Sequence, residues 1–356
     1  MLWSLPTPLR SLLATTALLR NQARGLSASS GSRAEDPLRI LFCGSDRFSI
    51  ASLDALVHTK HRCPGLIEDI HVAHRPAKPT GRGLKTLKEV PIRAAASALS
   101  LPTHTLDTFT GWTPPSPYNL IIAVSFGLLV PPRILSQARH GGLNVHPSLL
   151  PDLRGSAPIE HAVLQQRPYT GVSVQTLHPR RFDEGVVLAQ TPAPGLAIAA
   201  DETADVLKER LARAGAQMLV HVLVERRFVE PVHSAAWYAG ATTYAPKITK
   251  QDRFVAFETM TMARVLAVQR ALGDTWCLLP NGERLVMHEI GALDSADGVA
   301  MEHGQAALWY HETRRELLFR TACGRIGIVK SSTYPGGKAG KGNAKVEKML
   351  RVQAKL

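Results

Sequence analysis

The chain has 356 residues, of which 45% are apolar, and a formal net charge of +13. This length allows two domains, and the apolar share is ordinary for globular proteins, which excludes a fibrous or wholly disordered chain. No stretch approaches the ~20 consecutive apolar residues that a helix needs to cross a bilayer, so we expect no membrane-spanning segment. The four cysteines stand apart without C-x-x-C spacing, which predicts neither a disulfide framework nor a zinc site.

Residues 1–33 differ in composition from the rest of the chain. They contain four arginines, many serines and leucines, and no acidic residue. A basic, acid-free segment whose leucines can form one face of a helix is typical of a mitochondrial targeting presequence. We therefore predict a mitochondrial matrix protein with residues 1–33 as its presequence. The alternative is a disordered basic tail.

Predicted strands and helices alternate from residue 34 to residue 226. This alternation predicts an α/β domain with a Rossmann-like open sheet, whose strands are largely parallel and carry helices on both faces. The expected strands are 38–43, one within 66–73, 118–124, 142–145, 171–177 and 186–190, and the expected helices are 48–57, 85–99, 131–138, 156–166 and 203–225.

Short strands dominate the last third of the chain. Residues 227–245 have little periodicity and are predicted to be a linker, and a helix is expected over 254–270. Short strands and turns follow, which favours a small barrel or sandwich over 246–356. The expected strands are 275–279, 284–290, 306–310, 317–321 and 326–329. From Gly240 onward there are 17 Lys and Arg residues against 11 Asp and Glu, a surplus that attracts phosphate but does not by itself identify a nucleic-acid partner.

Asn144 and His146 stand at the end of a predicted strand. Because they are two residues apart, their side chains point to the same side, beyond a strand end where α/β sheets bind ligands. Two converging donors can stabilise a carbonyl oxygen as it becomes negatively charged, and Asp183, after another predicted strand, could orient the imidazole. No serine or cysteine sits in a nucleophile elbow, so a substrate would supply the attacking group. The alternative is structural: Asn144 caps the strand and His146 packs against a proline.

A longer motif gives these residues a specific context. Asn144-Val-His-Pro-Ser-Leu-Leu-Pro151, followed by Arg154-Gly155, resembles the signature of the 10-formyltetrahydrofolate-dependent formyltransferase family. The resemblance implies a formyltransferase fold in which Asn144, His146 and Asp183 are catalytic, with 10-formyltetrahydrofolate as the formyl donor and no metal. It also implies folate contacts from two segments, which are Phe126, Gly127, Leu128 and Leu129, and Ser148, Leu149, Leu150 and Pro151.

Two further segments resemble the members of this family that formylate initiator methionyl-tRNA. Residues 75–83, Arg-Pro-Ala-Lys-Pro-Thr-Gly-Arg-Gly, are similar to a basic loop that those enzymes insert into the acceptor stem. Residues 243–248, Thr-Tyr-Ala-Pro-Lys-Ile, are similar to the entry of their C-terminal OB-like domain, for which 246–356 would be the counterpart. We expect a monomer. The tRNA contacts that the resemblance implies are Arg75, Lys78, Arg82, Lys85, Lys247 and Lys250.

On this interpretation the formyl group moves from N10 of the folate to the α-amine of methionine on the tRNA. Asn144 and a protonated His146 would stabilise the oxyanion, and Asp183 would orient His146 and help to collect the amine proton. Three alternatives remain open. A 10-formyltetrahydrofolate hydrolase would pass the formyl group to water, and another folate-dependent transferase would use the amine of a nucleotide or sugar. A non-catalytic RNA-binding relative would have no physical reason to keep all three catalytic residues.

Overall fold

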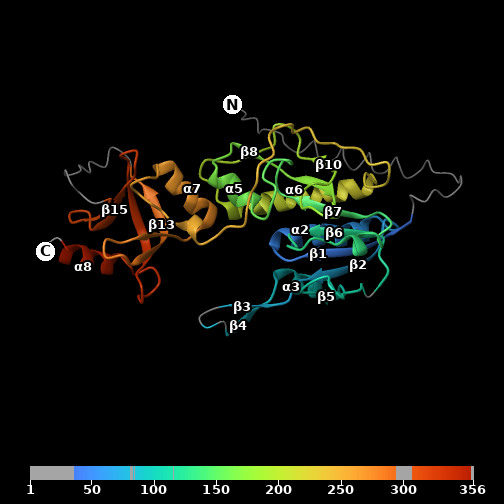
Figure 1. The fold of residues 1–356 in the computed structure, drawn as a ribbon, viewed down its shortest axis with the longest axis horizontal. Coiled ribbons are helices and arrows are strands. Elements are labelled where there is room, and N and C mark those ends of the chain that lie inside the picture. Colours follow the sequence, from blue (N-terminus) through green and yellow to red (C-terminus); the bar gives the residue numbers. More distant parts are fainter. Residues whose placement is uncertain (1–35, 81–82, 84, 115, 294–306, 354–356) are drawn as a thin grey trace, which may run out of the picture. The chain divides into compact units, whose positions relative to one another are not determined.

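Residues 36–80, 83, 85–114, 116–293 and 307–353 are described by the structure, a computed structural model (Figure 1). The presequence predicted for residues 1–33 and the predicted RNA contact Arg82 lie outside the described residues. No helix of the described part is long and apolar enough to cross a membrane.

The larger of the two main sheets has seven strands, in the order β10-β9-β7-β6-β1-β2-β5. Five adjacent strands run parallel to one another, and these are β1 (Leu38–Gly44), β2 (Ile67–His74), β5 (Thr103–Thr105), β6 (Leu120–Val124) and β7 (Gly142–His146). At one edge, β9 (Ser173–Thr176) and β10 (Val187–Gln190) extend the sheet in the antiparallel sense. All five residues of β6 are buried, as expected for a strand covered on both faces. The predicted open, largely parallel α/β sheet is confirmed.

The helices around this sheet begin where local capping chemistry favours a start. α2 (Arg47–Arg62) follows Asp46, whose carboxylate accepts a hydrogen bond from the Ser49 N–H at 3.1 Å. Thr203 caps α6 (Ala204–Val224) in the same way. Proline occupies the first turn of the remaining three, where its missing N–H leaves no bond unmade. These are α3 (Pro91–Ala98), α4 (Pro132–Leu135) and α5 (Pro158–Leu164).

The helix predicted over 85–99 is wrong in its first part. Thr86–Lys88 form strand β4, which pairs antiparallel with β3 (Lys78–Thr80) in a two-stranded hairpin (Figure 1). The helix starts only at Pro91, because a proline favours the first helical position and disfavours helical geometry at the residue before it. A second two-stranded pairing that the sequence did not predict joins β8 (Tyr169–Thr170) to β11 (Leu196–Ala197).

Hydrophobic clusters cover both faces of the seven-stranded sheet, since alternate residues of a strand point to opposite faces. In β1, Ile40 and Phe42 belong to the larger cluster, which includes Phe48 of α2. Leu41 and Cys43 belong to a smaller cluster on the other face. The sheet therefore has no solvent-exposed face at its centre, and ligands must bind at strand ends.

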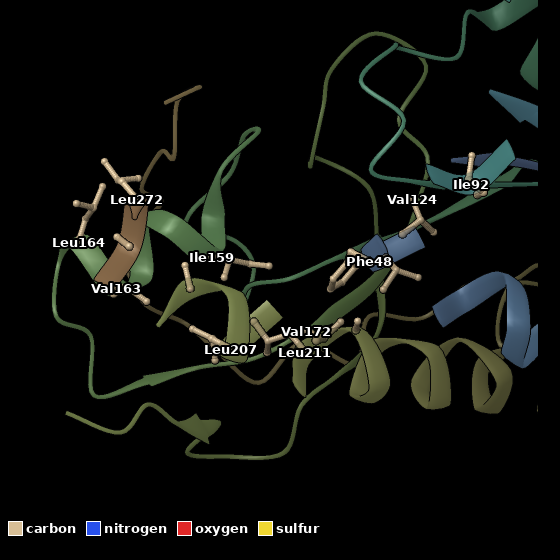
Figure 2. Packing of buried hydrophobic residues seen from close by; sticks show 14 of the residues in the cluster. Phe48, Ile92, Val124, Ile159, Val163, Leu164, Val172, Leu207, Leu211 and Leu272 are labelled. Carbon is tan, nitrogen blue, oxygen red and sulfur yellow. The ribbon is translucent and has the colours of Figure 1, made fainter. Parts of the chain in front are cut away.

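Helix α6 approaches the sheet closely at Gly215. A Cβ atom built there would lie 2.8 Å from the Val145 side chain and 3.2 Å from that of Val172, so glycine permits the approach. Figure 2 shows Leu211 of the same helix next to Val172. This packing holds β7 and the start of β9, the two strands that position the candidate site.

The predicted C-terminal domain is present as a five-stranded antiparallel sheet of order β12-β13-β16-β15-β14. Its first helix, predicted over 254–270, begins later than expected, because the Thr261 side chain accepts a hydrogen bond from the Arg264 N–H and thereby caps α7 (Met262–Leu272). The remaining elements are η3 (Gln251–Arg253), β12 (Thr275–Leu278), β13 (Arg284–Ala292), β14 (Leu308–His311), β15 (Glu316–Arg320), β16 (Ile326–Thr333) and α8 (Asn343–Gln353).

Helix α7 packs against α5 of the first domain. The Arg264 guanidinium donates a hydrogen bond to the Leu164 carbonyl at 2.6 Å, and Val163, Leu164 and Leu272 belong to the same hydrophobic cluster (Figure 2). Side chains of the two predicted domains thus belong to one hydrophobic cluster. The domain boundaries at residues 226 and 245 stay predictions.

The four cysteines should differ strongly in reactivity. Burial raises the pKa of the Cys43 and Cys277 thiols to about 12, whereas a hydrogen bond from the Thr321 hydroxyl lowers the pKa of exposed Cys323 to about 7. Only the thiolate is nucleophilic. We therefore expect iodoacetamide near neutral pH to alkylate Cys323 before Cys63, and the two buried cysteines only after unfolding, as read by peptide mass spectrometry. The Cys323 rate should fall as the pH drops below its pKa, and equal labelling of all four sites in folded protein would contradict this order.

Candidate active site

A cavity of about 470 Å³ lies beside the ends of β6 and β7. Its lining comes from the segment after β6 (Ser125–Val130), from β7 and the following proline, from the start of α5, and from the end of β9 with the loop after it. The structure brings Asn144, His146 and Asp183 together in this lining, although Asp183 lies far from the other two in sequence.

The Asn144 side chain is hydrogen-bonded at both ends. Its Nδ2 donates to the Ala123 carbonyl at 2.9 Å, and its Oδ1 accepts from Gln175 Nε2 at 3.1 Å. An amide nitrogen carries two hydrogens, so one of them has no partner among the described residues. Because Asn144 lines the cavity, this hydrogen is available to an oxygen atom of a ligand.

Both ring nitrogens of His146 have partners. Nε2 lies 3.0 Å from the Leu153 carbonyl, and since a carbonyl only accepts, Nε2 carries a hydrogen. Nδ1 lies 3.3 Å from Asp183 Oδ1, and the two side chains are only 6% and 9% exposed. This contact is an ion pair when the imidazole is protonated. The imidazole therefore has no free donor for a ligand in this arrangement.

Asp183 has a left-handed backbone conformation, with φ of 56°, which a residue with a Cβ adopts at some cost. Its Oδ2 accepts a hydrogen bond from the Gly155 N–H at 2.8 Å, and its Oδ1 accepts one from Gln175 Nε2 at 3.3 Å. The carboxylate is therefore held in place by Gly155 and Gln175 and lies against the His146 ring.

Gly185 allows the loop that carries Asp183 to lie directly on β9. A Cβ atom at this position would be 1.7 Å from the Thr176 carbonyl oxygen, a distance that no side chain can adopt. The Gly185 N–H donates to Gln175 Oε1 at 3.0 Å, and the Val186 N–H donates to Thr176 Oγ1 at 2.9 Å. The glycine two residues after Asp183 therefore has a steric cause.

A segment distant in sequence fastens the loop after β7. The Arg154 N–H donates to the Thr243 carbonyl at 2.9 Å, and the Ala245 N–H donates to the Arg154 carbonyl at 2.7 Å. The Leu153 N–H also donates to Thr243 Oγ1 at 2.9 Å. Leu153 supplies the carbonyl that binds His146. The end of the predicted linker therefore helps to fix the orientation of the imidazole.

The two predicted folate segments differ in position. Phe126, Gly127, Leu128 and Leu129 all line the cavity. Ser148, Leu149, Leu150 and Pro151 are not among its lining residues. Within that second segment, the Ser148 carbonyl accepts a hydrogen bond from the Ser173 hydroxyl at 2.8 Å. The Leu150 N–H donates to Ser173 Oγ at 3.0 Å. A direct folate contact from these four residues stays a prediction that the geometry does not support.

A second cavity, of about 450 Å³, contains two of the predicted RNA contacts. Arg75, Lys78 and Lys88 line it, together with Ser125–Gly127, which also line the first cavity. The Arg75 guanidinium forms an ion pair with Asp107 at 2.7 Å. Lys78 and Lys88 are exposed and have no ion pair with the residues that the structure describes. The hairpin therefore presents two unneutralised cations beside the first cavity.

Three further predicted RNA contacts are exposed cations that line neither cavity. Lys85 precedes β4, and Lys247 and Lys250 lie between Ala245 and η3. The Lys250 carbonyl accepts a hydrogen bond from Trp276 Nε1 at 2.9 Å. These three residues add positive charge, and no cavity residue depends on them.

Several cavity residues were not singled out in the sequence. Lys208 Nζ and Glu160 Oε1 form an ion pair at 3.4 Å on one wall, and Arg181 pairs with Glu184 at 2.8 Å near Asp183. Gln175 was missed as well, although a polar residue within a predicted buried strand is itself a signal. Among the residues that the structure describes, no group of three or more His, Cys, Asp or Glu side chains could hold a metal ion.

Comparison with protein families gives one match over more than half of the chain. The model of the formyl transferase family matches residues 38–223. Among curated proteins, the mitochondrial methionyl-tRNA formyltransferase of Saccharomyces cerevisiae is 37% identical over 285 residues, covering 69% of this chain and 70% of that protein. The mitochondrial methionyl-tRNA formyltransferase of Homo sapiens is 30% identical over 313 residues, covering 83% of this chain and 74% of that protein.

Solved structures agree on the fold. An N-formyltransferase from Helicobacter canadensis, in complex with folinic acid and dTDP-3-aminofucose, has a TM-score of 0.54 at 12% identity, over 82% of this chain and 98% of that one. A sugar N-formyltransferase from Shewanella sp. has a TM-score of 0.50 at 18% identity, over 69% of this chain and 95% of that one. At these identities the likeness concerns the fold alone.

Replacing Gly185 tests the loop geometry. We expect Gly185→Ala to lower the free energy of unfolding by about 1–3 kcal/mol, because its Cβ would overlap the Thr176 carbonyl and force the loop away from β9. Urea unfolding followed by circular dichroism measures this. The matched control is Gly291→Ala in β13, where the nearest atom to the added Cβ lies at 3.5 Å, so that the change should stay within about 0.5 kcal/mol. Equal stability of the two variants would show that the loop tolerates displacement.

Proposed function

The chain belongs to the formyl transferase family, and we propose that it transfers the formyl group of 10-formyltetrahydrofolate to the α-amine of methionine on initiator tRNA. The product is formylmethionyl-tRNA for mitochondrial translation initiation. The observation that carries the proposal is the arrangement of Asn144, His146 and Asp183 around one cavity, with a free amide hydrogen beside the His146–Asp183 pair.

The donor substrate fits the first cavity. Its volume of about 470 Å³ lies within the range of small-molecule sites, roughly 300–1,000 Å³. Phe126, Leu128 and Leu129 supply an apolar wall of the kind that covers a flat pterin ring. The formyl oxygen would then accept the unpaired Asn144 hydrogen. In this proposal Ser148–Pro151 support the loop from the protein interior, because their polar atoms are bonded to Ser173.

The reaction exchanges one C–N bond for another. The neutral α-amine of the methionyl ester attacks the formyl carbon, and the carbonyl electron pair moves onto oxygen. Asn144 donates to this oxyanion, and the charge of the nearby His146 imidazolium stabilises it without a direct hydrogen bond. When the oxyanion collapses, the C–N10 bond breaks. The Asp183 carboxylate takes the amine proton through a water molecule and the proton goes to N10, so that the pair ends as it began.

Positive charges beside the first cavity would position the acceptor substrate, methionyl-tRNA. Lys78 and Lys88 stand in the second cavity, which adjoins the first at Ser125–Gly127, and unpaired cations attract the phosphates of an RNA end. Arg82 belongs to the same basic loop in sequence, and Lys85, Lys247 and Lys250 add charge on other segments. We further propose that the protein acts in the mitochondrial matrix and as a monomer.

Removing one oxyanion donor tests the catalytic assignment. We expect Asn144→Ala to lower kcat about 10²–10³-fold, equivalent to ~2.7–4 kcal/mol in the barrier, because the formyl oxygen loses its free donor. His146→Ala and Asp183→Ala should likewise lose most turnover. Formylation of methionyl-tRNA with labelled 10-formyltetrahydrofolate measures kcat, and filter binding measures the affinity for tRNA, which should be preserved. Near-normal turnover of His146→Ala would contradict its role.

The same assay separates this function from the alternatives. Wild-type protein is offered labelled 10-formyltetrahydrofolate with methionyl-tRNA, with free methionine, with nucleotide or sugar amines, or with water alone. We expect label in methionyl-tRNA only. Release of labelled formate without an amine would identify a hydrolase, and transfer to a free amine would identify another transferase. Binding of tRNA without any loss of the formyl group would identify a non-catalytic relative.

Charge removal on the basic loop should affect the RNA substrate selectively. We expect Lys78→Ala and Arg82→Ala to raise KM for methionyl-tRNA several-fold, with little change in KM for the folate, because each loses one phosphate contact. The slope of log KM against log salt should decrease by about one for each residue removed. Arg62→Ala, which removes an exposed cation at the end of α2, is the matched control. An equal rise in KM for Arg62→Ala would show that overall positive charge, and not a contact made by the basic loop, sets the affinity for tRNA.

A further inference from the structure

Gln175 occupies the centre of the polar network around the catalytic residues. It lies on β9 and is 1% exposed. Its Nε2 donates to Asn144 Oδ1 at 3.1 Å and to Asp183 Oδ1 at 3.3 Å, and its Oε1 accepts from the Gly185 N–H at 3.0 Å. One side-chain amide therefore touches two of the three residues assigned to the reaction, and also the glycine that closes the Asp183 loop.

The direction of every bond in this network is determined by the two backbone groups at its ends. The Gly185 N–H can only donate, so it faces Gln175 Oε1, and Nε2 must point the other way. The Ala123 carbonyl can only accept, so it faces Asn144 Nδ2, and Oδ1 must face Gln175. Reversing either amide would place two donors or two acceptors against each other. The network thus has a single arrangement without such a clash.

This arrangement controls both partners of Gln175. With Oδ1 held by Gln175 and one Nδ2 hydrogen held by Ala123, Asn144 keeps a second Nδ2 hydrogen for the formyl oxygen. The other Gln175 hydrogen is donated to Asp183 Oδ1 and fixes the orientation of the carboxyl group that faces His146. Because the same nitrogen makes both bonds, the two catalytic groups are held at a constant separation across the β7–β9 edge.

Few side chains could replace glutamine here. Glutamate has no hydrogen to donate and would place a second carboxylate against Asp183. Methionine has a similar length and no donor at all. Asparagine keeps the amide but is one methylene shorter, so it cannot reach Asn144, Asp183 and Gly185 together. The three bonds thus require the length of glutamine as well as its amide.

We propose that Gln175 is a positioning residue for formyl transfer, which aligns Asn144 and Asp183 and takes no part in bonding to the substrates. The inference rests on the proposed function only for its readout, because the hydrogen bonds exist in the protein alone. Loss of the Gln175 amide disturbs the oxyanion donor and the acid–base pair together, while the walls that bind folate and tRNA remain intact. The chemical step should therefore suffer much more than substrate binding.

The test compares two glutamine-to-methionine substitutions. Gln269 in α7 is the matched control, since it also bridges two elements through its amide, donating to the His288 carbonyl at 3.2 Å and accepting from the Ile290 N–H at 3.0 Å. We expect Gln175→Met to lower kcat about 10–100-fold, the usual effect of losing a group that orients a catalytic residue, with KM for both substrates within about threefold of wild type. Gln269→Met should lower the melting temperature by about as much as Gln175→Met does, and it should leave kcat unchanged.

A double-mutant cycle asks whether Gln175 acts through Asn144. In the Asn144→Ala background, Gln175→Met should cost less than it does in wild type, because one of its two functional bonds is already absent. Fully multiplicative effects would overturn the proposal, as would a kcat of Gln175→Met within twofold of wild type or a loss confined to KM. If Gln175→Met does not fold, Gln175→Asn supplies the same comparison, with a lowered kcat expected and a normal kcat contradicting the proposal.

Failure of the proposed function would be recognised separately. If wild-type protein does not formylate methionyl-tRNA, the function is wrong whatever the variants do. The cycle is then run on the acceptor that wild type does use, whether another amine or water. A large kcat loss for Gln175→Met on that acceptor would still support the positioning role, and an unchanged kcat would still exclude it.

Discussion

The contact between His146 Nδ1 and Asp183 Oδ1 is the interaction on which the site depends. The two atoms are 3.3 Å apart between side chains that are almost fully buried. In such surroundings a polar group without a partner is costly, whereas polar groups that face each other are tolerated. All the other features of the site serve this pair: Gly155 and Gln175 donate to the carboxylate, and the Leu153 carbonyl holds the far side of the ring.

The contact depends on two loops, which follow different strands. One loop returns from β9 and can lie on that strand only because Gly185 has no side chain. The other loop follows β7 and is fastened by Thr243–Ala245. Thr243 lies 90 residues after Leu153, to which it is hydrogen-bonded. The sheet supplies a rigid base, since α6 packs against β7 and β9 through Gly215. Rigid strands with fastened loops keep a small polar site within the narrow tolerances that catalysis requires.

The sequence and the structure differ at several points. Strand β4 was predicted as part of a helix, because the residues of the hairpin have no strong alternation and β3 and β4 depend on each other for pairing. The segment Ser148–Pro151 was expected to touch folate, and this contact stays a prediction; in the structure, Ser173 binds polar atoms of the segment from a neighbouring strand. His146 was expected to donate to an oxyanion, whereas its two nitrogens face the Leu153 carbonyl and Asp183. In each case the outcome depends on a partner that the local sequence pattern does not reveal.

From the sequence alone one could predict the alternating α/β order, the later run of short strands, and Asn144, His146 and Asp183 as candidate catalytic residues. The reason is that these signals are local: strand parity places Asn144 beside His146, and the motif that contains them resembles a family in which the counterpart of Asp183 is catalytic. The tertiary structure alone decided that β7, β9 and β10 pair antiparallel at the sheet edge, that Gln175 joins Asn144 to Asp183, and that Asp183 lies against the His146 ring. Those features depend on which strands become neighbours and which buried polar atoms must then find partners, and hydrogen-bond geometry across strands is not encoded in any short stretch of residues.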